Sequence, residues 1–189
     1  MRIAVFLVCL GLAPAAMAHE LGVTQAVATF DHGAYRIDIS IDPDALLARL
    51  ELAGGLPISG SIQPAERDER IASLSALFLE GVRIRFDKGA VTPSFHYQAG
   101  TASQTPSMIS LDGRLPHGAR AWTLEYQFAM GWFAVDTRTG GVLLSTTWVE
   151  GGKASPPIQL AKQLKWQPRA AAPLLLLGIA AIGWRRRSR

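Results

Sequence analysis

The central part of the chain alternates apolar and polar residues with the period of a β-strand. In residues 35–41 the apolar positions are 35, 37, 39 and 41, which indicates a strand with one buried face. Residues 22–30 precede it across the turn sequence Asp31-His32-Gly33, so the two runs predict a β-hairpin. Further short strands separated by turn residues are predicted at 82–86, 91–97, 108–115, 121–128, 132–137 and 142–149.

Two helices interrupt this series of strands. Asp42-Pro43 is a helix start, with aspartate as N-cap and proline at the first position, and Gly54-Gly55 is the corresponding stop. A second helix is predicted from Pro64 onward, because its apolar residues recur at spacings of three and four; these are Ile71, Leu74, Leu77 and Phe78. The expected fold is therefore mainly β (α+β): a β-sandwich-like domain with two inserted helices, followed by a single C-terminal transmembrane helix.

The N-terminal segment has the layout of a secretory signal. Residues 1–18 contain Arg2, an apolar run over 3–12 and the small-x-small site Ala16-Met17-Ala18. The alternative is an uncleaved anchor, although the run is shorter than the roughly 20 residues that span a bilayer. Cleavage after Ala18 makes His19 the N-terminus of an exported domain over residues 19–160.

The C-terminal segment predicts a membrane anchor. Residues 170–184 are apolar, residues 185–189 form a basic cytoplasmic tail, and residues 161–169 form a polar linker. Trp166 and Trp184 are separated by about 27 Å of helix, close to the hydrocarbon thickness. Two other interpretations remain open: a buried core helix, and a sorting tail resembling exosortase signals that would be cleaved to release the protein at the cell surface. The leading prediction is an inner-membrane anchor with the domain in the periplasm.

Charge and cysteine content exclude several classes of protein. The chain carries a net charge of +4, but residues 19–160 hold 11 basic and all 15 acidic residues, a net charge of −4. The basic excess belongs to the ends and not to a nucleic-acid-binding surface, so no nucleic-acid partner is expected. Cys9 is the only cysteine and lies in the predicted signal, so the mature domain does not depend on disulfides.

No catalytic signature is visible in the exported domain. It contains no Ser-His-Asp signature, HExxH motif, phosphate loop or dinucleotide glycine pattern. No residues therefore support a hydrolase activity. Asp42 and Asp44 are interpreted as helix caps and not as a catalytic carboxylate pair. Trp122, Trp132 and Trp148 lie in predicted strands and are interpreted as core residues, the alternative being a platform on which a ligand stacks. A non-enzymatic protein is expected.

His19 is the one candidate metal ligand. As a new N-terminus it offers an α-amine and an imidazole, which together suit Cu(II) or Ni(II). His32 and His96 have no diagnostic spacing, and no second ligand is identified. The simpler interpretation is that this histidine merely follows the cleavage site, in which case the protein has no cofactor.

Five short motifs in this order resemble the extracytoplasmic N-terminal region of HupE/UreJ-type membrane proteins. They are AHEL at 18–21, IDPDALL at 41–47, LFLEGVRIRF at 77–86, LPHGA at 115–119 and WVEGGKAS at 148–155. The resemblance covers roughly residues 19–160. It implies an exported accessory module linked to nickel handling or to a neighbouring membrane protein. The multipass half of that family, with its histidine-rich helices, is replaced here by a single predicted anchor, so transport is not implied. The sequence therefore predicts a membrane-anchored periplasmic binding or accessory module; the alternative is a copper- or nickel-binding protein, or a copper enzyme, that uses His19.

Overall fold

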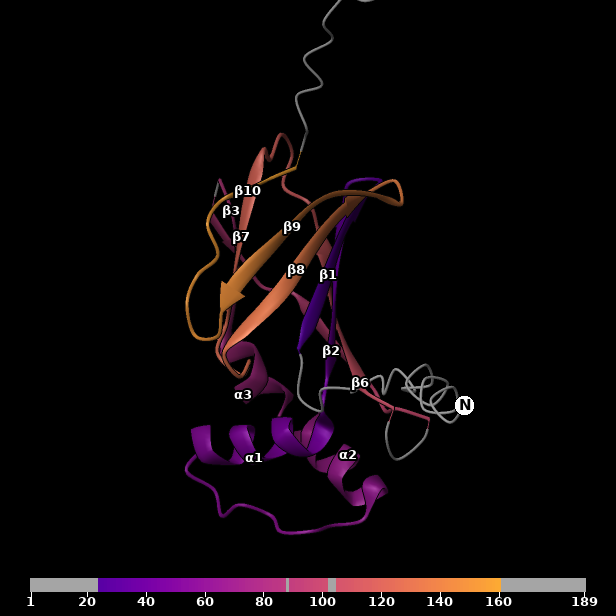
Figure 1. The fold of residues 1–189 in the computed structure, drawn as a ribbon, viewed down its shortest axis with the longest axis vertical. Coiled ribbons are helices and arrows are strands. Elements are labelled where there is room, and N and C mark those ends of the chain that lie inside the picture. Colours follow the sequence, from indigo (N-terminus) through magenta and orange to yellow (C-terminus); the bar gives the residue numbers. More distant parts are fainter. Residues whose placement is uncertain (1–23, 88, 102–104, 161–189) are drawn as a thin grey trace, which may run out of the picture.

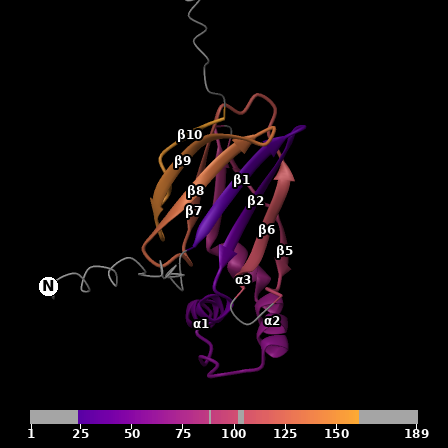
Figure 2. The same ribbon diagram turned by 45° about the vertical axis from the view of Figure 1, so that its right-hand side comes forward.

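A computed structural model describes residues 24–87, 89–101 and 105–160 (Figure 1). The strands of this part form two sheets. In the six-stranded sheet the order is β5 (Ser94–Gln98), β6 (Ser107–Arg114), β2 (Ala34–Ile41), β1 (Gln25–Asp31), β8 (Trp132–Thr139) and β9 (Val142–Glu150) (Figure 2). In the four-stranded sheet it is β10 (Ile158–Gln159), β7 (Ala121–Tyr126), β3 (Val82–Phe86) and β4 (Gly89–Val91). The prediction of a mainly β fold is confirmed.

The larger sheet is mixed, because β1 lies between an antiparallel and a parallel neighbour. β1 pairs with β2 through the predicted hairpin, with Asp31 opposite Ala34. On its other side β1 runs parallel to β8, with Gln25 opposite Ala134. The remaining pairings are antiparallel.

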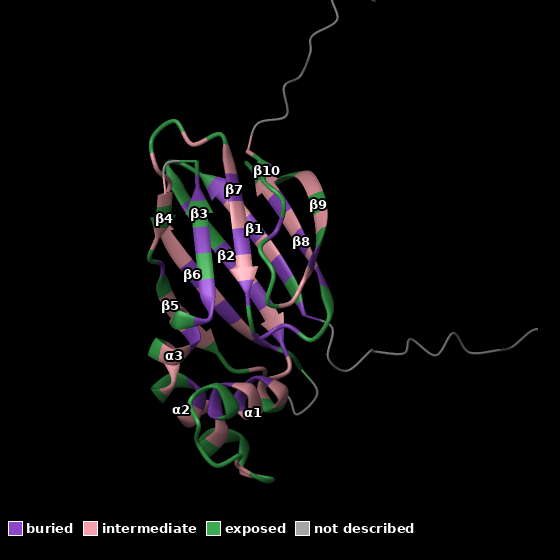
Figure 3. Ribbon diagram, turned by 90° about the vertical axis from the view of Figure 1, so that its left-hand side faces the viewer, coloured by how far each residue is buried: buried purple, intermediate pink, exposed green. Residues whose placement is uncertain are grey.

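The core lies between the two sheets. Each central strand buries alternate residues, which the banding of β1, β3 and β7 makes visible in Figure 3. Phe30 of β1 packs on Trp122 of β7 with ring centroids 5.2 Å apart, and Phe133 of β8 packs edge-on against Tyr126 of β7 at 5.9 Å. These contacts join the sheets as a sandwich, as the strand pattern predicted.

The helices cover one end of the sandwich (Figure 1). α1 (Pro43–Ala53) begins as predicted, because the Asp42 carboxylate accepts hydrogen bonds from the backbone N–H groups of Asp44 and Ala45. The predicted second helix is instead two helices, α2 (Pro64–Ser73) and α3 (Ser75–Glu80). At Leu74 the backbone leaves the helical region, with φ −94° and ψ 14°, and a new helix starts there.

One predicted strand is also divided. Residues 91–97 were expected to be continuous, but β4 ends at Val91 and β5 begins at Ser94, and the two belong to different sheets. Pro93 lies between them. Proline lacks a backbone N–H and restricts the residue before it, so the chain leaves one sheet and crosses to the other at this point.

The predicted signal, linker, anchor and tail lie outside the described residues, as does His19. Among the residues that the structure describes, no helix is long and apolar enough to cross a membrane.

Candidate functional site

Three large apolar side chains, one on β8, one on β9 and one just before β8, are exposed to solvent. They are Met130, Trp132 and Trp148, exposed by 64%, 63% and 61% of their surface. We call these three residues the tryptophan surface. Tryptophan and methionine are enriched at protein interfaces, and tryptophan is among the residues that contribute most binding energy there. Two exposed tryptophans on one strand pair therefore form the leading candidate for a binding site.

Strand register places the two tryptophans together. Trp132 lies opposite Glu150, and Ala134 lies opposite Trp148. Trp148 is thus two residues from the partner of Trp132, on the same face of the sheet, within the diagonal spacing at which large side chains touch. The base of this hairpin is closed by a hydrogen bond from the Gly151 N–H to the Gly131 carbonyl, 2.8 Å long.

The core interpretation of the tryptophans is correct for Trp122 and wrong for Trp132 and Trp148. Trp122 is 1% exposed. In β8 the neighbours Phe133 and Val135 are the buried residues, so Trp132 must point outward by strand alternation. In β9 the buried residue is Val149, which turns Trp148 outward in the same way. The stacking platform, the alternative interpretation, agrees with this geometry.

Acidic groups flank the tryptophan surface on the same strand pair. Asp136 accepts a hydrogen bond from the Thr146 hydroxyl at 2.7 Å. Glu150 forms an ion pair with Lys153 at 2.7 Å. Each carboxylate also has a cation beside it, since Arg138 lies 3.9 Å from Asp136 and Lys153 pairs with Glu150, so charges of both signs border the tryptophan surface.

A second feature is a groove on the outer side of the four-stranded sheet, with a volume of about 530 Å³. Arg83 and Arg85 of β3 line one side, and the segment 154–157 beside β7 forms another. Glu125 lies 3.6 Å from Arg83 and offsets part of its charge. The groove is open and its indole, Trp122, packs on Phe30 in the core. It is therefore a weaker candidate than the tryptophan surface.

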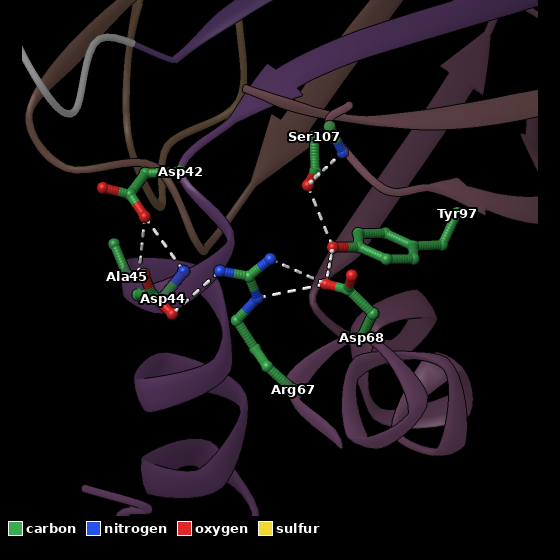
Figure 4. A network of polar contacts seen from close by, with 8 residues as sticks. Asp42, Asp44, Ala45, Arg67, Asp68, Tyr97 and Ser107 are labelled. Carbon is green, nitrogen blue, oxygen red and sulfur yellow. Dashed lines mark hydrogen bonds and ion pairs between the residues drawn. The ribbon is translucent and has the colours of Figure 1, made fainter. Parts of the chain in front are cut away.

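A third feature is a polar network between the helices and the sheet (Figure 4). Arg67 of α2 bridges the carboxylates of Asp44 and Asp68, at 3.2 and 3.0 Å. The Tyr97 hydroxyl donates to Asp68 at 2.7 Å and lies 3.0 Å from the Ser107 hydroxyl. Burial, together with the Asp68 carboxylate, raises the pKa of Tyr97 to about 12, so this phenol stays protonated at neutral pH. Each member has a partner within the protein, and we interpret the network as a structural link between α1, α2, β5 and β6.

Glu51 is the one fully buried carboxylate among the described residues. It accepts hydrogen bonds from the backbone and hydroxyl of Ser59, both 2.6 Å, and it pairs with Arg70. Burial alone would raise the pKa of this carboxyl group, but the Ser59 and Arg70 hydrogen bonds outweigh burial and the pKa lies below its ordinary value. Through these contacts the Glu51 carboxylate connects the 54–63 loop with α1 and α2.

Glu51→Gln is expected to lower stability at pH 7 by about 1–3 kcal/mol, because hydrogen bonds to a charged acceptor are lost. A lowered folded-state pKa contributes stability that is present above the unfolded pKa, about 4.3, and is lost as pH falls through the folded pKa. The difference in the free energy of unfolding between wild type and variant should therefore become smaller below about pH 4. Urea denaturation of the full-length protein in mild detergent at pH 7, 5 and 3.5 measures it. The exposed Glu69→Gln on α2 is the control, and equal behaviour of the two variants would contradict the prediction.

The candidate residues predicted for metal or catalysis do not assemble in the described part of the chain. No group of three or more His, Cys, Asp or Glu side chains that could hold a metal ion occurs among the described residues. His96 lies 3.8 Å from Asp112, and His32 lies 3.5 Å from Asp31 at the β1–β2 turn. The Asp42 carboxylate caps α1, as the sequence predicted, whereas the Asp44 carboxylate pairs with Arg67 in the polar network. Copper or nickel binding at His19 stays a prediction, because that residue lies outside the described residues.

No protein-family model matches this chain, and no curated protein matches it either.

Proposed function

We propose that this protein is a membrane-anchored, extracytoplasmic binding or accessory module without catalytic activity. The observation that carries the proposal is the tryptophan surface. Two tryptophans on one strand pair, and Met130 just before β8, are exposed without the free energy that their burial would give, which indicates that another molecule covers them in the working state. The predicted signal and anchor at the two ends support an exported domain held at a membrane.

We propose a protein, and not lipid, as the occupant of the tryptophan surface. Asp136 and Glu150 lie on the same strand pair, each beside a cation, so the polar groups around the tryptophan surface carry charges of both signs. A protein segment with an apolar centre and a polar rim of both charges complements the exposed indoles and these ion pairs. The HupE/UreJ resemblance suggests a neighbouring membrane protein, one concerned with nickel, as that partner. The alternative function, a copper- or nickel-binding protein or a copper enzyme, depends on His19 alone.

Photo-crosslinking in intact membranes tests the proposal. A photoreactive amino acid at Met130 of the full-length chain should give an adduct with a second, different membrane polypeptide. The adduct should decrease at least tenfold in the double variant Trp132→Ser/Trp148→Ser, since these residues provide the central contacts. The matched control is Leu52→Ser/Ile58→Ser, which removes two other exposed apolar side chains, 69% and 60% exposed.

The remaining outcomes separate the alternatives. An adduct with a second copy of this chain would show that the tryptophan surface serves self-association, and the accessory role would be overturned. Adducts with lipid alone would overturn the choice of a protein partner. Equal adduct yields in both double variants would show that the tryptophan surface is not the contact.

A further inference from the structure

β9 forms a long open edge of the six-stranded sheet (Figure 3). Among the described strands it pairs only with β8, and it ends the strand order. With nine residues it is the longest described strand, whereas the other three sheet edges are formed by β5, β4 and β10, with five, three and two residues. Short edge strands limit pairing with other chains, and β9 lacks this protection.

The side chains of β9 do not protect its edge either. Natural sheet edges commonly carry lysine, proline or a bulge that prevents pairing. Residues 142–149 contain no charged residue and no proline. Instead the strand exposes three large apolar side chains, those of Val142, Leu143 and Trp148. The register with β8 shifts at Thr137/Arg138, which leaves Leu144 without a partner. This shift affects only the part of β9 next to its turn, so residues 145–150 form a regular and open edge.

Strand alternation shows which backbone groups point to this edge. The Gly151 N–H donates to the Gly131 carbonyl at 2.8 Å, one step beyond the last residue pair of the β8–β9 ladder. Hydrogen-bonded and non-hydrogen-bonded pairs alternate along an antiparallel ladder. Trp148 and Thr146 therefore belong to non-hydrogen-bonded pairs, and their N–H and C=O groups point away from β8, toward the open edge.

This edge adjoins the tryptophan surface. Trp148 is exposed on the outer face of β9, and Trp132 lies diagonally across from it on β8. A strand added along β9 would lie about 4.8 Å away from it, close enough for its outward side chains to cover the Trp148 indole. Backbone hydrogen bonds and apolar contact would then act on one segment, and this combination is how sheet edges bind extended peptides.

The place where the described chain ends favours a different chain, and not a second copy, on this edge. The Leu160 N–H donates to the Arg120 carbonyl, at the end of the sandwich opposite the helices (Figure 1). Two copies related by a two-fold axis would pair their β9 strands antiparallel and would therefore send these two ends, with the predicted anchors that follow, in opposite directions. One of the two linkers would have to run back along its own domain to reach the same bilayer.

We propose that an extended segment of a partner protein binds as an additional strand along residues 145–150 of β9. This inference rests on the proposed function, because it describes how the partner of the tryptophan surface binds. Complementarity to β9 defines the segment. It has no charged residue where it faces 145–149, and it carries apolar side chains at alternate positions, which cover Trp148. Hydrogen bonds to the backbone of Thr146 and Trp148 provide affinity, and the alternate side chains provide selectivity.

Photo-crosslinking of the full-length chain in intact membranes at two sheet edges tests the added strand. A photoreactive amino acid at Leu143 should give an adduct with the same membrane polypeptide as one at Met130, because a strand along β9 reaches both. Leu143 lies about 17 Å along the strand from Trp148, so a partner that contacts only the tryptophan surface does not reach it. Ser94, exposed on β5 at the opposite edge, is the control and should give at least fivefold less adduct.

Two variants of Thr146 separate the backbone contribution from that of the side chain. Thr146→Pro removes the outward N–H and Thr146→Val keeps it, while both lose the hydroxyl group that donates to Asp136. Proline is tolerated on an edge strand where its nitrogen faces solvent. The adduct from Met130 should be at least fivefold lower in Thr146→Pro than in Thr146→Val. Urea denaturation checks that both variants fold, and the comparison of Leu143 with Ser94 uses the unaltered strand and decides the question if the proline variant is unstable.

The other outcomes separate this inference from the proposed function. An adduct from Met130 without one from Leu143, or equal adducts in the two folded Thr146 variants, would overturn the added strand and leave the proposed function standing. A Leu143 adduct with a second copy of this chain would overturn the choice of occupant. Absence of any adduct with another membrane polypeptide at all positions would overturn the proposed function, and the added strand with it.

Discussion

Replacing Phe78 by alanine is expected to destabilise the domain by about 3–5 kcal/mol, the range for removing a fully buried phenylalanine. Phe78 is 0% exposed and stacks on Phe128 with ring centroids 5.5 Å apart. It also contacts Tyr126 at 5.8 Å and Phe95 at 5.2 Å, so it joins α3 to both sheets. Its loss leaves a cavity where three elements meet, and the surrounding strands cannot close on it without breaking their pairing.

Urea denaturation of full-length protein in mild detergent, followed by tryptophan fluorescence, measures this loss. Leu52→Ala on α1 is the control, because Leu52 is 69% exposed and its truncation should change stability by less than about 0.5 kcal/mol. A change of similar size in both variants would show that Phe78 does not join the layers in solution.

Gly151→Ala is expected to cost about 1–3 kcal/mol, because a new methyl group must push the backbone apart. A Cβ at this position would lie 2.3 Å from the Ala129 carbonyl oxygen, much closer than van der Waals contact. The strain falls on the Gly131–Gly151 hydrogen bond that holds the base of the β8–β9 hairpin. The variant should therefore lose both stability and crosslinking from Met130.

Gly60→Ala is the matched control for this variant. A Cβ on Gly60 meets nothing within 4 Å. It should leave the urea midpoint and the crosslinking yield unchanged. Retention of wild-type stability by Gly151→Ala would contradict the expected clash.

Local patterns were sufficient to predict the hairpin, the first helix and the mainly β class. The alternation over 35–41 has a period that only a strand matches, and Asp42-Pro43 combines two independent start signals. The division of the second helix at Leu74 has no such signal. Residues 71–78 keep helical spacing across the break, and beyond it Phe78 packs on Phe95 and Tyr126 of the two sheets.

The tryptophan surface was missed because alternation does not say which face of a strand is buried when both carry aromatic residues. Trp132 and Phe133 are adjacent and equally apolar, so either could have pointed inward. The choice depends on the opposite sheet, where Tyr126 receives Phe133. The polar network was beyond prediction for a related reason: Arg67, Tyr97 and Ser107 meet through the fold and have no fixed spacing in the sequence.

Because β1 pairs in parallel with the distant strand β8, the domain can be completed only late during synthesis of the chain, which proceeds from the N-terminus. β1 and β2 can form their hairpin early. The second neighbour of β1 is β8, which can pair with it only after residues 132–139 have been synthesised. Pairings this distant in sequence form slowly, and until then β1 keeps an open edge that can join another strand. A chain stopped before residue 139 therefore exposes an aggregation-prone edge, and a chaperone that holds this edge would govern the yield of folded protein.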